Sequence, residues 1–260
     1  MPAELSPVAA TVHRFDRERF VTALFAPEPE RERLMVLYAF NVELSKIRES
    51  VREPVAGMIR LQWWREILAG NRPDEGARHP VAAPLCRLGL PGDEIDAMLA
   101  AREMDLEPAP FADIEALAGY AAATSGRLAQ WACRVLGADD SGTLRAAGLA
   151  GTGYGLAGLI RATPVHQRGG WHSLPGGAAA DRAGTVAALV PVAGLAADLL
   201  AQARKTRVGR TAIPAFLPAT LASAHLGILT AAGGDPFDSR VARPRTLPFR
   251  LLFNSWLGRF

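Results

Sequence analysis

The sequence is poor in the residues that would cross-link it or bind zinc. Its 260 residues include only two cysteines, Cys86 and Cys133, which lie far apart and form no C-x-x-C pair. A disulfide framework is therefore not expected, and we predict that both thiols are buried in a reducing cytoplasm. The five histidines form no i, i+4 pair and have no cysteine ligands nearby, so we expect no metal site.

Long apolar runs and the common catalytic motifs are also missing. The first 20 residues lack the apolar core of a signal peptide, and no uninterrupted apolar run reaches the roughly 18 residues of a spanning helix. The sequence has no G-x-S-x-G elbow, P-loop or kinase motif. We therefore expect a cytoplasmic protein, with peripheral contact at the inner face of the cytoplasmic membrane left open.

One G-x-G-x-x-G match, from Gly153 to Gly158, needs a separate interpretation. A dinucleotide site requires this motif to follow a strand and to begin a helix. Here the motif lies within an Ala- and Leu-rich helical segment with no preceding strand pattern. Small residues at this spacing favour close helix packing instead.

What is abundant is helix-forming sequence. Hydrophobic residues make up 49% of the chain but aromatic residues only 7%, and Ala and Leu are prominent, which favours helices over sheets. The predicted helices span residues 16–24, 28–53, 55–69, 81–87, 92–106, 113–137, 143–161, 181–205, 213–230 and 245–258. A Gly- and Pro-rich loop is expected at 163–179. The fold class is an all-α bundle: a flexible N-terminus at 1–14, then one helical domain at 15–260.

Two aromatic features allow either a packing role or a contact with a partner. Trp63 and Trp64 are adjacent on a predicted helix, about 100° apart, so we expect one in the core and the other at its margin. Residues 239–260 hold five Arg and no acid, interleaved with Phe253, Trp256 and Leu257. This basic amphipathic segment (240–260) predicts either a helix docked on the bundle or one that meets an anionic membrane. Nucleic acid binding is not expected, because the net charge is only +3.

Three stretches together resemble the squalene and phytoene synthases. They are "YAF" with the downstream "LQWWREILAG" (38–40 and 61–70), "YAAATSGRLAQWACRVLG" (120–137), and "GTGYGLAGLIRATPVHQRGGWHSLP" (151–175). The resemblance implies a helical bundle of the isoprenoid (prenyl) synthase type around a central cavity. It also implies two acidic clusters on facing helices, where magnesium ions neutralise a diphosphate leaving group.

The acidic clusters are nearly absent from this sequence. The first falls on Ser45, Lys46, Arg48 and Glu49, and the second on Ala162 and His166, so a single acid remains. Neighbouring cations would repel magnesium by several kcal/mol. We therefore expect no catalytic residue, no metal and no cofactor. Magnesium would be bound only under the alternative hypothesis, in which the protein is a head-to-head prenyl transferase.

The basic residues at these positions suggest another alternative. Lys46, Arg48, Arg52, Arg161 and Arg168 could hold a phosphate directly, without a metal. The ligand would then be a prenyl lipid or a phospholipid.

A closer likeness favours a non-catalytic role. "AFNVELSKIRESVREPVAGMIRLQWWRE" (39–66) resembles a degenerate branch of this family that is represented by a mitochondrial complex I assembly factor. That resemblance implies an assembly factor or chaperone whose partners are subunits or assembly intermediates of a membrane respiratory complex. The residues expected to contact the cavity or a partner are Tyr38, Phe40, Asn41, Glu43, Gln62, Trp63 and Trp64.

Overall fold

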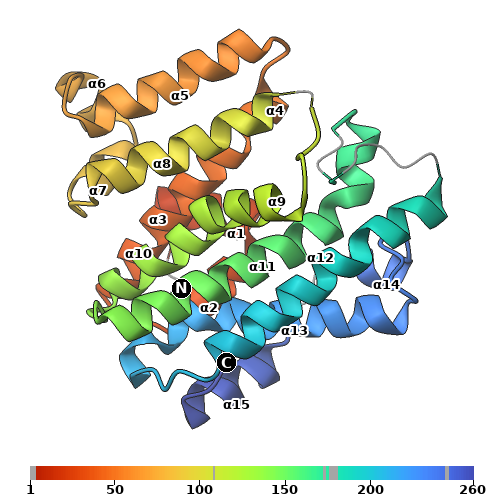
Figure 1. The fold of residues 1–260 in the computed structure, drawn as a ribbon. Coiled ribbons are helices and arrows are strands. Elements are labelled where there is room, and N and C mark those ends of the chain that lie inside the picture. The colour runs from red at the N-terminus through yellow and green to blue at the C-terminus, as the bar shows by residue number, and fades with distance from the viewer. Residues whose placement is uncertain (1–3, 108, 172–173, 176–180, 244–245) are drawn as a thin grey trace.

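The computed structural model describes residues 4–107, 109–171, 174–175, 181–243 and 246–260, and all regular structure in them is helical (Figure 1). The first half contains α1 (Pro7–Phe15), α2 (Arg17–Ala23), α3 (Glu30–Ser45), α4 (Ile47–Ser50), α5 (Pro54–Leu68), α6 (Pro73–Arg78), α7 (Ala82–Cys86), α8 (Gly92–Glu103) and the 3₁₀ turn η1 (Met104–Leu106). The second half contains α9 (Ile114–Ala121), the π-helical segment η2 (Ala122–Gly126), α10 (Arg127–Val135), α11 (Ser141–Arg168), α12 (Arg182–Ala203), the 3₁₀ turn η3 (Arg210–Ala212), α13 (Ile213–Ala231), α14 (Ser239–Ala242) and α15 (Pro248–Leu257). The predicted all-α class is thus confirmed for the described residues.

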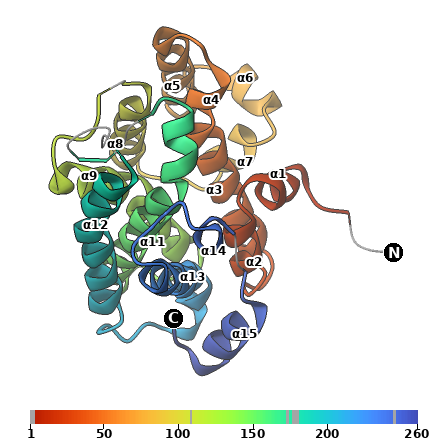
Figure 2. The ribbon, with the colours of Figure 1, turned by 90° about the vertical axis from the view of Figure 1, so that its right-hand side faces the viewer.

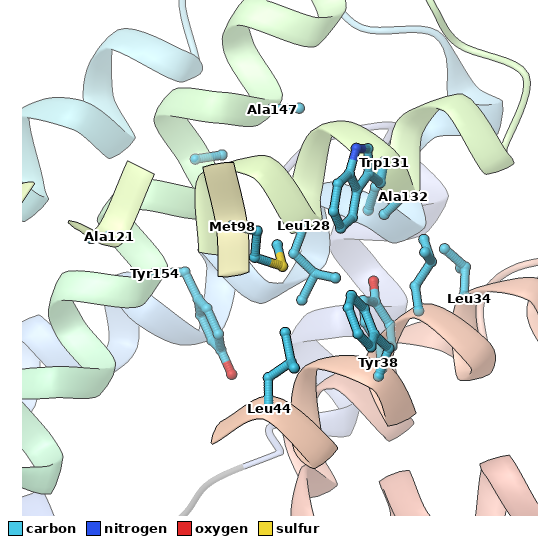
Figure 3. Packing of buried hydrophobic residues seen from close by; sticks show 14 of the residues in the cluster. Leu34, Tyr38, Leu44, Met98, Ala121, Leu128, Trp131, Ala132, Ala147 and Tyr154 are labelled. Atoms are coloured by element: carbon cyan, nitrogen blue, oxygen red, sulfur yellow. The ribbon is translucent and has the colours of Figure 1, made fainter. Parts of the chain in front are cut away.

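Helix α11 is the centre of the bundle. It contacts α9, α10, α12, α13 and η2, whereas α5 to α8 form a separate layer at the upper left of Figure 1. The hydrophobic core lies between α11 and this layer. There, Tyr38 and Leu44 of α3 contact Met98 of α8 and Leu128 and Trp131 of α10 (Figure 3). These side chains are almost fully buried. The packing holds α3, whose C-terminal end lines a cavity, against α10.

Polar N-caps determine where many of the helices begin. The side chains of Ser6, Asp16, Asp113, Asp140 and Asp181 each accept a hydrogen bond from the backbone N–H three residues later. Each bond satisfies one of the donors that a helix leaves free at its first turn. The Asp113 cap begins α9 at Ile114, next to the start of the helix predicted at 113–137.

The N-terminal segment that was expected to be flexible forms a helix. Helix α1 begins at Pro7, and Val8, Ala9 and Val12 are buried in the core beside α3. Ser6 as N-cap and proline at the first helical position are a recognised start signal. The prediction of a flexible 1–14 is therefore wrong for residues 7–14, while residues 1–3 lie outside the described part.

The long helix predicted at 28–53 is interrupted. Helix α3 ends at Ser45, whose hydroxyl donates to the carbonyl of Val42 at 3.0 Å, and Lys46 forms the junction to α4. A serine that bonds back to its own helix competes with the backbone and favours such bends. The break falls on the degenerate acidic stretch (45–49). Residues of α4 then line a cavity beside the C-terminal half of α11.

Helix α11 extends further than predicted, through Pro164 to Arg168. Proline removes one backbone donor, but the last turn is closed by Gly169 N–H to Val165 C=O and by Trp171 N–H to His166 C=O, at 3.0 and 2.9 Å. Gly170 then adopts φ +73°, a conformation open to glycine at little cost. This reversal brings Trp171 back over the end of the helix. Only part of the predicted 163–179 loop is described.

The glycine motif in α11 packs against neighbouring helices, as predicted. A Cβ on Gly153 would lie 2.8 Å from Leu200 Cγ in α12 and 3.0 Å from the carbonyl oxygen of Ala196. A Cβ on Gly155 would lie 2.8 Å from Ser125 Cβ in η2. The absence of side chains here lets α11 approach both neighbours closely.

The tryptophan pair also follows its prediction. Trp64 is buried and Trp63 packs at the margin of the core, with their ring centroids 5.1 Å apart. The cysteine prediction holds only for Cys133, because Cys86 is exposed at the end of the short α7.

Within the described residues, two helices are long and apolar enough to cross a membrane by length and composition. The most apolar stretch of η3 and α13 is 78% buried in the bundle. The most apolar stretch of α12 is 28% buried. Both helices pack against α11, and core helices of globular proteins meet the same criterion.

Candidate functional site

A cavity of about 1080 Å³ opens between the end of α3 and the C-terminal half of α11. Its walls come from α1, α2, α3, α4, α5, α8, η1, α9, η2 and α11, and from the segment 169–171 that follows α11. The lining includes Phe15, Asp16, Arg19, Asn41, Ser45, Lys46, Arg48, Glu49, Arg52, Arg102, Asp105, Tyr120, Thr124, Ser125, Tyr154, Arg161, Ala162, Val165, His166 and Trp171. The π-helical segment η2 widens α9–α10 at this wall, and such segments often occur at functional sites.

Both degenerate acidic stretches face this cavity. Ser45, Lys46 and Glu49 reach it from the α3–α4 junction, and Ala162 and His166 reach it from α11. The sequence therefore located the two facing stretches, and the fold brings them to one cavity.

The donor set does not fit a magnesium site. Of the acids in the lining, Asp16 is paired with Arg19 at 2.8 Å, and Asp105 is paired with Arg102 at 3.1 Å. Glu49 remains as one exposed carboxylate beside Lys46. In the part of the chain that the structure describes, no group of three or more His, Cys, Asp and Glu side chains is placed to hold a metal ion. Hard divalent cations need several oxygen ligands together.

A buried polar network closes the inner wall near α8. Arg102 donates to Tyr120 Oη at 2.7 Å and to Asn41 Oδ1 at 2.9 Å, and the Tyr120 hydroxyl donates to Asp105 Oδ1 at 2.7 Å. Burial raises the pKa of Tyr120 far above its ordinary value, so this hydroxyl remains a donor. Because the charges cancel within the network, it shapes the cavity without adding net charge.

A second buried cluster binds Arg161. The carboxylate of Glu18 pairs with the Arg161 guanidinium, accepts from Tyr154 Oη at 2.9 Å, and lies 2.8 Å from His225 Nε2. Burial opposes ionisation of Glu18, but the hydrogen bond from His225 and the charge of Arg161 lower its pKa to about 2. Arg161 is thus neutralised internally by a residue of α2.

Three cations of the lining have no carboxylate within ion-pair distance among the described residues: Lys46, Arg48 and Arg52. The Lys46 ammonium lies 3.4 Å from the Phe15 ring centroid, and Arg48 donates to the Asp105 carbonyl at 2.5 Å. These three residues give the α4 side of the cavity a positive charge that Glu49 offsets only in part.

Trp171 covers the outer edge of the cavity. Its ring lies 5.0 Å from the Arg48 guanidinium and 4.3 Å, between centroids, from the His166 ring. Burial, with the charge of Arg48 adding to it, lowers the pKa of His166 to about 4. His166 is therefore neutral at physiological pH. Its Nδ1 is buried without a hydrogen-bond partner in the described structure.

Several predicted site residues lie elsewhere. Arg168 is not part of the lining and donates to the carbonyl of Pro164. Of the residues expected to contact the cavity or a partner, only Asn41 lines it. Tyr38 and Phe40 are core residues, Glu43 is half-buried, Gln62 is exposed and bonds to Glu66, and Trp63 and Trp64 pack on the far side with Phe40 and His79.

Sequence reasoning missed the buried network and the aromatic cover. Arg102 and Asp105 lie in the stretch 92–106, which was predicted only as a helix. Tyr120 and Trp171 were within the stretches that carried the family resemblance, but their spacing gave no sign that they meet Arg102 and Arg48.

The arrangement defines a helical isoprenoid synthase fold with a central cavity. Two solved structures share it: a squalene synthase, HpnC, from Alicyclobacillus acidocaldarius, and a dehydrosqualene synthase crystallised with a ligand. The first has a TM-score of 0.74 and 18% identity over 88% of this chain and 94% of that one. The second has a TM-score of 0.78 and 13% identity over 96% and 93%.

The chain belongs to the squalene/phytoene synthase family, which it matches over residues 12–248. Curated relatives are named NADH dehydrogenase (ubiquinone) complex I, assembly factor 6. The bovine protein is 31% identical over 155 residues, which are 58% of this chain and 46% of that protein. The human protein is 30% identical with the same coverage, and the rat protein is 27% identical over 94% of this chain and 80% of its own length. The chain thus spans about half the length of the first two relatives in these alignments.

Proposed function

We propose that this chain is a non-catalytic member of its family that assists assembly of an NADH:ubiquinone oxidoreductase-like respiratory complex. The observation that carries this proposal is the donor set of the cavity. The two degenerate acidic stretches face each other across the cavity, and of its described lining carboxylates only Glu49 has no ion-pair partner, among several cations. The names of the relatives support the same direction.

Under this proposal the partners are subunits or assembly intermediates of that complex. The protein works in the cytoplasm, at the inner face of the cytoplasmic membrane where such intermediates are built. Deleting the gene should lower the NADH:ubiquinone oxidoreductase activity of isolated membranes, while the activity of an unrelated respiratory dehydrogenase stays unchanged. A deletion strain with normal complex I content and activity would contradict the proposal.

A second candidate function is metal-free binding of an amphiphilic anion in the cavity. The specific observation is that Lys46, Arg48 and Arg52 line one side of it without carboxylate partners among the described residues. Cations in a partly enclosed cavity favour a phosphate group, and the apolar part of the lining can accept a prenyl or acyl chain.

The test is titration calorimetry with a prenyl diphosphate in the presence of EDTA. Lys46→Ala with Arg52→Ala should weaken binding by about tenfold or more, because each removes an unpaired cation. Arg168→Ala is the matched control, since this arginine lies outside the cavity lining. No binding by the natural protein, or an equal loss in the control, would refute the binding function.

The prenyl transferase hypothesis is the remaining alternative. It requires magnesium to be held by the residues of this cavity, and their donor set does not fit that role. Magnesium-dependent release of diphosphate from a prenyl diphosphate decides between it and the non-catalytic proposal.

A further inference from the structure

Helix α15 presents an uncovered apolar face. Phe249, Leu252, Phe253 and Trp256 are 86%, 59%, 58% and 70% exposed. Their spacing of three and four residues places them on one side of the helix. Large apolar side chains that are this exposed and contiguous usually mark a contact surface.

The opposite side of α15 is anchored to the bundle. Leu251 is fully buried with Ile213 and Leu217 of α13, and Asn254 donates to Thr220 Oγ1 at 3.0 Å. Beyond the helix, the Phe260 ring packs on Phe216 with centroids 4.5 Å apart. The uncovered face therefore belongs to a helix held in place by its other side.

A basic rim accompanies this face. The loop between α12 and α13 carries four exposed cations, Arg204, Lys205, Arg207 and Arg210, and α15 with its C-terminal extension adds Arg250 and Arg259. No Asp or Glu occurs between Asp198 and Asp235, or after Asp238.

The loop and the helix are in direct contact. Arg204 Nε donates to the Phe260 carbonyl at 2.7 Å, and Arg210 lies beside Gly258. Burial lowers the pKa of Arg204, and the charge of nearby Arg250 lowers it further, which places like charges together at this end of the molecule. The cations of the loop and of the C-terminal segment therefore lie beside α15 and its apolar face.

We propose that α15 and the 204–210 loop form a docking surface for an anionic lipid bilayer. Phe and Trp side chains insert at the level of the head groups, and the surrounding cations meet lipid phosphates. A second copy of this chain fits the surface poorly, because two such faces would bring their basic rims together.

The docking surface is separate from the cavity. In both views α15 lies at the lower end of the molecule and α4, which carries the cavity cations, lies at the upper end (Figures 1 and 2). Docking through α15 would leave the cavity end facing away from the membrane, accessible to another protein. The inference does not depend on the assembly role, and vesicle binding tests it alone.

The first test is co-sedimentation of the full chain with vesicles of phosphatidylcholine, with and without one-third phosphatidylglycerol. The natural protein should bind the anionic vesicles. Phe253→Ser with Trp256→Ser should weaken this binding by at least about tenfold, because the inserted apolar surface is lost. Val55→Ser with Ile59→Ser is the matched control, since these α5 side chains are 69% and 64% exposed near the other end.

The second test changes the charge of the rim. Lys205→Glu with Arg207→Glu should weaken binding to anionic vesicles by on the order of tenfold or more, and added salt should reduce the difference. Arg87→Glu with Arg145→Glu, two exposed arginines outside the rim, is the control and should retain most of the binding.

The outcomes separate the occupants of the surface. The melting temperature of each variant, measured by circular dichroism, establishes that the bundle is intact. Failure of the natural protein to sediment with anionic vesicles would overturn the proposal. So would equal losses in the test and control pairs. An oligomer that exists without lipid and dissociates in the Phe253/Trp256 variant would assign the face to a second copy instead.

Discussion

Replacing Glu18 with glutamine tests the cluster that joins α2 to α11 and α13. The Glu18 side chain is 5% exposed, and its carboxylate is bound by Arg161, Tyr154 and His225. The substitution keeps the shape of the side chain but removes its charge. Because breaking a buried ion pair leaves its partner uncompensated, the cost should be considerable.

The magnitude follows from the pKa of Glu18, which is lowered from 4.5 to about 2. Each unit corresponds to about 1.4 kcal/mol, so the ionised carboxylate contributes about 3 kcal/mol to the free energy of unfolding at neutral pH. Arg161 is a quarter exposed, and water compensates part of its lost partner. We therefore expect Glu18→Gln to lower the free energy of unfolding by about 2–3 kcal/mol.

Because the pKa of Glu18 is lowered by folding, its contribution to the free energy of unfolding depends on pH. A carboxyl group whose folded pKa is lowered contributes stability above its unfolded pKa and loses it as the pH falls through the folded pKa. Here the window runs from about 4.5 down to about 2. The advantage of the natural protein over Glu18→Gln should shrink by about 2 kcal/mol between about pH 6 and pH 3.

Urea unfolding followed by far-ultraviolet circular dichroism at the two pH values measures both effects. Glu115→Gln is the control, because Glu115 is exposed, and it should change the free energy of unfolding by less than about 0.5 kcal/mol. A Glu18→Gln variant as stable as the natural protein would refute the reasoning. A deficit that is independent of pH would refute its electrostatic part.

Two further predictions concern packing and thiol reactivity. Gly153→Ala should lower the free energy of unfolding by about 1–2 kcal/mol, because the new Cβ would press on Leu200. Gly158 has open space around it, so Gly158→Ala should raise the free energy of unfolding by about 0.5–1 kcal/mol. Equal effects of the two substitutions in denaturant unfolding would contradict the packing account. The exposed thiol of Cys86 should react promptly with a disulfide reagent. Burial raises the pKa of Cys133 to about 12, so this thiol should react only after unfolding. Rapid modification of both thiols would show that the core opens readily.

Much of the fold could be predicted because local signals agree with the tertiary structure. Helical periodicity located most of the helices, and the family resemblance gave the bundle its type. The misplaced boundaries have local causes. The Ser45 hydroxyl bends the chain at Lys46, and α11 passes through Pro164 because its last turn is closed by other bonds. Neither effect leaves a periodic signal in the sequence.

The candidate site was predicted only in part. The positions that face the cavity were found because the resemblance to the squalene and phytoene synthases placed the two acidic clusters on them. Which cations remain uncompensated depends on contacts distant in sequence, such as Glu18 with Arg161 or Asn41 with Arg102. The sequence therefore predicted that Arg161, like Arg48, could bind an anion. In the structure the Glu18 carboxylate neutralises Arg161. The free charge is concentrated on Lys46, Arg48 and Arg52.

The most direct test of the non-catalytic account is diphosphate release. The purified full chain is incubated with farnesyl or geranylgeranyl diphosphate and an excess of magnesium, and released diphosphate is followed over time beside a reaction without protein. The account predicts no release above that background, because one unpaired carboxylate cannot hold the metal ions that ionise a diphosphate. Magnesium-dependent release that is abolished by Glu49→Gln would contradict it.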